Sequence, residues 1–163
     1  MTEIYGLSFQ GDWKKDIFMG LLVGGLFIFS NALLPAIAIG FPTLPQATTT
    51  DSYLLVGGVA PVFEEIAFRG VLLSVLIIMF GLAFLPSAII VSIVFSLYHI
   101  IAYAGSIAAI GTITGSLIAA FIFSIVMCYL IKYTNNISST ITAHSMFNIY
   151  LLSKMAFVFG VMV

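Results

Sequence analysis

Long apolar runs dominate this chain, and five of them are each long enough to cross a lipid bilayer as one helix. About 20 apolar residues suffice for one crossing. The runs lie near residues 17–40, 52–80, 84–103, 106–131 and 137–159. They are continuously apolar and lack the period-2 alternation of membrane strands. The sequence therefore predicts an all-α fold, a polytopic transmembrane helical bundle of about five spans.

The composition excludes an ordinary soluble domain. Charged residues make up 7% of the chain and hydrophobic residues 62%, whereas soluble domains carry about 25% charged residues. Many of the charges fall in a short polar N-terminal segment, residues 1–16. We expect residues 1–163 to form one membrane domain with the lipid bilayer as its partner. The net charge of −1 gives no reason to expect a nucleic acid partner.

The positions of the lysines predict an orientation. Lys14 and Lys15 precede the first run, and Lys132 follows the fourth. A cytoplasmic N-terminus places all three on the cytoplasmic side, as the positive-inside rule prefers. We therefore expect an integral protein of the plasma membrane with its N-terminus in the cytoplasm. Residues 36–38 resemble a signal-peptide cleavage site, but the preceding apolar run is longer than usual and more spans follow, so the first span is expected to be retained.

Two backbone signals lie inside the apolar runs. Pro61 interrupts the second run, and it is expected to kink that helix because proline removes a backbone hydrogen bond and clashes with the preceding turn. Gly111 and Gly115 form G-x-x-x-G in the fourth run, a pattern typical of a close-packing helix face. Packing within the chain is the favoured reading over a dimer interface, and the oligomeric state stays open.

Polar residues enter the second run as Glu64-Glu65-x-x-x-Arg69. A charge at bilayer depth costs roughly 3 kcal/mol, so such residues usually serve a site. Residues four apart share a helix face, which predicts an ion pair between Glu65 and Arg69. Glu64 lies about 100° further round the helix. We therefore expect Glu65 to be neutralised by Arg69 and to brace the helix, while Glu64 faces the bundle interior as a general base.

Two further motifs carry the histidines of the chain: Phe95-x-x-x-His99 in the third run and His144-x-x-x-Asn148 in the fifth. Taken singly, each has an ordinary explanation, because an intramembrane histidine can bond a nearby carbonyl and asparagine often joins helices. However, nearly every strongly polar side chain at bilayer depth belongs to one of the three motifs. Their concentration on three helices favours one common site.

These motifs, in this order, resemble the CAAX protease and bacteriocin-processing family, also called the Abi family of intramembrane proteases. The family pattern is E-E-x-x-x-R, then F-x-x-x-H, then H-x-x-x-N or D, and the flanking A-P-V-F-E-E-I-A-F-R-G-V-L is also similar to its first motif. The resemblance implies the core of that membrane fold. It also implies an intramembrane endopeptidase acting on a membrane-associated or prenylated substrate.

The resemblance further implies roles for single residues. Glu64 and His99 would hold and activate a water, and His144 and Asn148 would donate to the oxyanion of the tetrahedral intermediate. Glu65, Arg69 and Phe95 would be supporting residues.

The sequence leaves the need for a metal undecided. Glu64, His99 and His144 also make up a two-histidine, one-carboxylate set of the kind that holds catalytic Zn²⁺. The H-E-x-x-H signature is absent, so zinc stays open and no metal ligand is committed.

Two other classes of function are compatible with the pattern. A non-catalytic immunity or scaffold protein could retain the fold, although all polar positions of the motifs are intact here. A proton or ion translocator could use the carboxylates and histidines as a relay. A relay favours titratable groups spread through the bilayer depth, whereas a compact cluster that includes the non-titrating Asn148 is expected here. The natural substrate and its cleavage site are not determined by the sequence.

Overall fold

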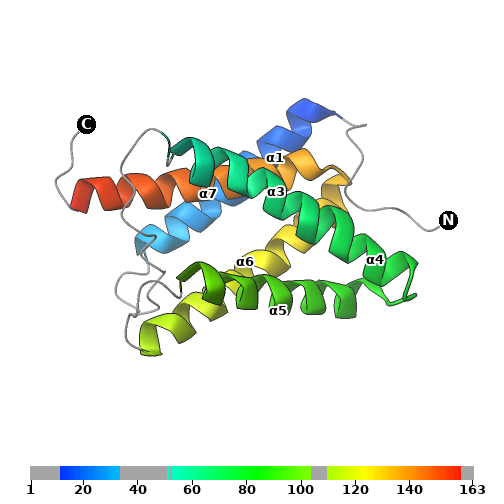
Figure 1. Ribbon diagram of the computed structural model, residues 1–163. Helices are drawn as coiled ribbons and strands as arrows, with labels where there is room; N and C mark the ends of the chain where they lie inside the picture. The colour runs from blue at the N-terminus through cyan, green and yellow to red at the C-terminus, as the bar shows by residue number, and fades with distance from the viewer. Residues whose placement is uncertain (1–11, 34–50, 52, 104–109, 159–163) are drawn as a thin grey trace.

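The computed structural model describes residues 12–33, 51, 53–103 and 110–158, and every element in these ranges is helical (Figure 1). The predicted all-α fold is therefore confirmed. The elements are α1 (Trp13–Leu33), η2 (Tyr53–Val59), α3 (Ala60–Glu65), η3 (Ile66–Leu72), α4 (Leu73–Ile78), α5 (Phe84–Tyr103), α6 (Ile110–Thr134) and α7 (Ile137–Val158).

The prediction of about five spans is not confirmed. Among the described residues, only Gly115–Thr134 in α6 is long and apolar enough to cross a membrane, and the apolar stretch Phe84–Ile100 of α5 is shorter. The polar motifs themselves account for part of the difference. The helical region 53–78 carries three charged residues, and α7 carries several hydroxyl, imidazole and amide side chains.

The helical region 53–78 changes its winding along its length. The segments η2 and η3 are π-helical, with α3 between them and α4 after them. Pro61 is buried and is the second residue of α3, two residues after the end of η2 at Val59. The sequence predicts a kink at this proline, and the structure has a change from π to α winding there. Short π-helical stretches are frequent at functional sites.

Two glycines of α1 let this helix approach α7 closely. A Cβ atom on Gly20 would lie 2.5 Å from the carbonyl oxygen of Ser139, and one on Gly24 would lie 3.1 Å from that of Ala143. This G-x-x-x-G pair lets the two backbones pack tightly, as small residues do in membrane bundles. The sequence-based expectation concerned a different pair, and the surroundings of Gly111 lie outside what the structure describes.

A buried polar contact fixes the end of the α1–α7 pair. Asn136, in the turn between α6 and α7, donates from Nδ2 to Asp16 Oδ2 of α1 at 2.8 Å. Its Oδ1 accepts from the backbone N–H of Ser138 at 2.9 Å at the start of α7. Both Asp16 and Asn136 are buried. The first and last described helices are therefore held in register at this end.

The apolar core consists of two clusters. One contains Leu73, Ala88, Val91, Cys128, Ile131 and Ile137. The other contains Phe95, Phe123, Met127, Leu130, Ala143 and Phe147. Phe68 of η3 packs against both clusters. The next residue, Arg69, therefore enters the bundle where the two clusters meet. In Figure 1, α6 crosses between α5 and the helices α1 and α7.

Candidate active site

Glu65 and Arg69 form a buried ion pair at the centre of the bundle. Arg69 Nη1 lies 3.0 Å from Glu65 Oε1, and both side chains are fully buried. Arg69 Nη2 also donates to the carbonyl oxygen of Ser124 in α6 at 3.4 Å. The guanidinium carbon lies 4.5 Å from the centre of the Phe95 ring of α5. The pair expected from the i,i+4 spacing is formed, and it joins η3 to both α5 and α6.

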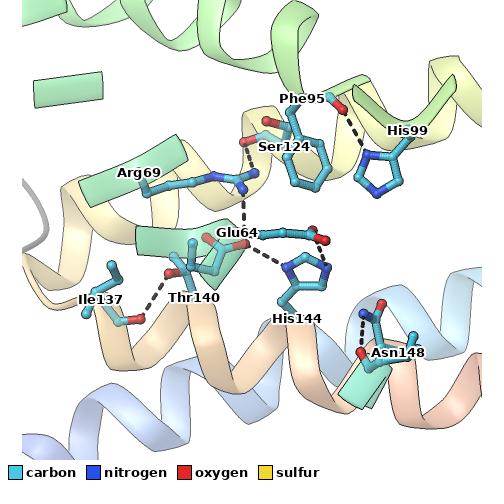
Figure 2. A network of polar contacts seen from close by, with 11 residues as sticks. Glu64, Arg69, Phe95, His99, Ser124, Ile137, Thr140, His144 and Asn148 are labelled. Carbon is cyan, nitrogen blue, oxygen red and sulfur yellow. Dashed lines mark hydrogen bonds and ion pairs between the residues drawn. The ribbon is translucent and has the colours of Figure 1, made fainter. Parts of the chain in front are cut away.

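Glu65 has a second partner that the sequence did not suggest. His144 donates from Nδ1 to the same Oε1 atom at 2.8 Å, as Figure 2 shows. A carboxylate oxygen only accepts, so Nδ1 carries the proton and Nε2 is the second, outward ring nitrogen. The expectation that Glu65 braces its helix with Arg69 did not include this contact, through which the carboxylate also orients His144.

Glu64 faces the other nitrogen of the same histidine. Its Oε2 atom lies 3.7 Å from His144 Nε2, and its side chain is 16% exposed whereas that of Glu65 is fully buried. The Oε2 atom is buried and has no hydrogen-bond partner among the described residues. The distance is too long for a direct hydrogen bond. The two side chains are therefore neighbours without a direct hydrogen bond between them.

His99 approaches from α5. Its Nδ1–H donates to the carbonyl oxygen of Phe95, one turn earlier, at 2.8 Å. The two rings lie 4.4 Å apart between centroids. Because the carbonyl accepts, the lone pair of a neutral His99 ring is on Nε2. Phe95 therefore supports His99 through its backbone and Arg69 through its ring.

Asn148 lies one turn after His144 on α7. Its Nδ2 donates to the carbonyl oxygen of Val56 in η2 at 2.9 Å, which Figure 2 also shows. The amide therefore joins the last helix to the π-helical segment that precedes the glutamate pair. Side-chain hydrogen bonds therefore join the region of the first motif to α7 at Glu65–His144 and at Val56–Asn148.

His99, His144 and Asn148 line one cavity of about 50 Å³. Its other lining residues are Phe95, Ser116, Ala119, Ala120, Phe123, Phe147 and Leu151. One buried water needs a cavity volume of roughly 10–15 Å³, so this cavity is large enough for more than one water. Glu64 is not among the lining residues. It contacts His144, which does line the cavity, at 3.7 Å.

The three residues considered for zinc do not gather as a ligand set. In the part of the chain that the structure describes, no three His, Cys, Asp or Glu side chains are placed to hold one metal ion. His144 and His99 both direct Nδ1 to acceptors of the protein, so Nε2 is the ring nitrogen that each could offer to an ion. Zinc ligands converge to about 2.0–2.2 Å from the ion. The side chains as they stand do not fit that geometry, and no step of the proposed reaction is assigned to a metal.

Two contributors to the site carry no sequence motif. Phe123 of α6 packs edge-on against His144, and the Val56 carbonyl holds Asn148. An apolar residue in an apolar helix and a backbone carbonyl have no distinctive sequence pattern. For the Val56 carbonyl, the sequence feature that bears on it is Pro61, five residues later in the chain.

A comparison with protein families supports the same region as the functional unit. The family model described as Type II CAAX prenyl endopeptidase Rce1-like matches residues 47–150. This range contains all three polar motifs and every cavity-lining residue except Leu151. No curated protein and no solved structure gives a significant match.

Proposed function

Because the chain belongs to the Rce1-like family of type II CAAX prenyl endopeptidases, we propose that it is an intramembrane endopeptidase that uses an activated water. The proposed substrate is a prenylated or otherwise membrane-associated peptide or protein. The observation that carries the proposal is the contact of Glu64 Oε2, at 3.7 Å, with Nε2 of His144, which lines one cavity together with His99 and Asn148.

The charges of the site support an acid–base pair. The Arg69 cation offsets the Glu65 carboxylate at 3.0 Å, and Glu64 lies next to His144 at 3.7 Å. With the proton on His144, Glu64 is a carboxylate that can accept a proton from water, and the imidazolium is stabilised by Glu65.

The proposed reaction follows from this pair. Glu64 takes a proton from the water. At the same time the oxygen of the water attacks the scissile carbonyl carbon, which gives a tetrahedral oxyanion. His144 donates from Nε2 to that oxyanion, and Asn148 supplies a neutral N–H donor. Collapse of the intermediate breaks the C–N bond, and the proton held by Glu64 passes to the leaving amine. His99 orients the water from the α5 side of the cavity.

Membrane placement is part of the proposal. The family is membrane-integral, and we propose a five-span arrangement in the plasma membrane with a cytoplasmic N-terminus. The turn between α6 and α7 then lies on the cytoplasmic side. A membrane-impermeant thiol reagent should label Asn135→Cys, in a Cys128→Ala background, only after the membrane is opened. Labelling of intact cells would contradict this orientation.

The test of the activity is cleavage of a fluorogenic peptide panel that contains prenylated and unprenylated members. We expect purified wild-type protein to cleave at least one member and Glu64→Gln to cleave none, although both elute as one monodisperse species. A Glu64→Gln protein that still cleaves would exclude the assigned base. Arms with chelator and with zinc added back separate glutamate-activated water from a metal-bound nucleophile.

A further inference from the structure

Asn148 is held by a backbone carbonyl rather than by another side chain. Its Nδ2 atom lies 2.9 Å from the Val56 oxygen. Since that oxygen can only accept, the amide must turn its nitrogen toward η2 and its oxygen away. The contact therefore fixes which end of the amide faces which way. An asparagine without such a partner could adopt either orientation.

The reason that this carbonyl is available lies five residues further along the chain. The segment η2 is π-helical, so its carbonyls bond N–H groups five residues ahead. Continued by one residue, the pattern would join the Val56 carbonyl to the N–H of residue 61. That residue is Pro61, which has no N–H. The π-helical ladder ends there, and the structure continues as α3 from Ala60.

The backbones of η2 and α7 are also close enough for the contact. A Cβ atom on Gly57 would lie 2.7 Å from Cγ1 of Ile149. Gly57 follows Val56, and Ile149 follows Asn148. The glycine therefore lets the carbonyl of η2 reach the amide of α7 within hydrogen-bond distance.

We propose that Pro61 is a positioning residue for Asn148: by withholding an N–H donor from the Val56 carbonyl, it reserves that carbonyl for the Asn148 amide. One N–H of the amide is then bound to η2. The planar amide group fixes the direction of the other N–H, which serves as the donor at the cavity. This inference rests on the proposed function for its effect on rate. Its structural content, the orientation of the Asn148 amide, is independent of that function.

The experiment compares Pro61→Ala with Pro86→Ala, a matched proline in the first turn of α5. We expect Pro61→Ala to lower kcat by about 10- to 100-fold, the scale of a small misplacement of a catalytic group, with KM unchanged. Asn148→Ala should lower kcat, and adding Pro61→Ala to it should cause no further loss. Pro86→Ala should leave kcat unchanged.

Two further measurements separate loss of the reserved carbonyl from loss of the proline ring. An α-hydroxy acid placed at position 61 replaces the N–H by an ester oxygen, so it should restore kcat although it lacks the ring. The side-chain amide signal of Asn148 in a ¹H–¹⁵N spectrum, assigned by its absence in Asn148→Ala, should shift in Pro61→Ala and not in Pro86→Ala.

The outcomes are distinct from those of the proposed function. An unshifted Asn148 amide signal in Pro61→Ala, or full additivity of Pro61→Ala and Asn148→Ala, would overturn the positioning role. If the amide signal shifts but the wild-type protein cleaves no member of the peptide panel, the positioning of Asn148 stands and the proposed peptidase function fails.

Discussion

The Nδ1 atom of His144 lies 2.8 Å from the Oε1 atom of Glu65, the same oxygen that binds Arg69. One buried carboxylate therefore neutralises a cation and orients an imidazole. A catalytic base or acid that is held by a third group is a recurrent arrangement in hydrolases. In this chain the arrangement gives adjacent glutamates different tasks, because Glu65 faces inward to Arg69 and His144 while Glu64 faces the outer nitrogen of His144.

Arg69→Ala is expected to destabilise the protein much more than Glu64→Gln. Removing the arginine leaves Glu65 as a fully buried charge without its cationic partner, a type of change that costs about 3–5 kcal/mol. Glu64 is part of no buried ion pair with arginine, and glutamine has nearly its shape. Unfolding in detergent micelles, followed by circular dichroism, measures the difference. Equal stability of the two variants would show that the Glu65–Arg69 pair does not brace the bundle.

A double variant separates the two tasks of Glu65. Arg69→Met combined with Glu65→Gln removes both charges, and replacing a buried pair by neutral groups is often close to neutral for stability. We therefore expect this variant to recover most of the stability lost in Arg69→Ala. The double variant should not cleave substrate, because His144 no longer has a carboxylate to stabilise its protonated form. Recovery of both stability and cleavage would mean that Glu65 only braces the helix.

The sequence predicts relationships within one helix better than relationships between helices. The Glu65–Arg69 pair follows from the i,i+4 spacing, and the different directions of the two glutamates follow from the helical turn. The bond between Glu65 and His144 could not be predicted in this way, because periodicity says which face of a helix is polar but not which neighbour it meets. For the same reason, the sequence does not predict which of the two histidines the Glu64 carboxylate contacts.

Backbone features show the same limit. The sequence contains G-x-x-x-G at residues 20 and 24 as well as at 111 and 115, and the pattern alone does not say which pair packs. The structure shows the close approach at Gly20 and Gly24. Pro61 indicates a break in regular winding, but it does not indicate that the residues before it form a π-helix.

Filling the cavity should reduce cleavage in a manner that depends on the substrate. Ala120 of α6 lines the cavity, and Ala120→Leu adds apolar volume there at a cost of about 1–3 kcal/mol in stability. Peptides with a large side chain next to the scissile bond should lose cleavage first, and those with glycine or alanine last. Ile122→Leu on the exposed face of the same helix is the control. A uniform loss for all peptides would show that the cavity does not receive substrate side chains.

Two glycines of α1 should respond to alanine with opposite signs. A Cβ atom on Gly20 meets the Ser139 carbonyl oxygen at 2.5 Å, whereas one on Gly25 meets nothing within 4 Å. Gly25→Ala should stabilise the protein by roughly 0.5–1 kcal/mol, since alanine is the better helix former. Gly20→Ala should destabilise it by about 1–3 kcal/mol, because overpacking forces α1 away from α7. It should also slow cleavage, since α7 carries His144 and Asn148. Chemical unfolding of both variants in the same micelles gives the two signs directly, and a stabilising effect of Gly20→Ala would contradict the α1–α7 packing described here.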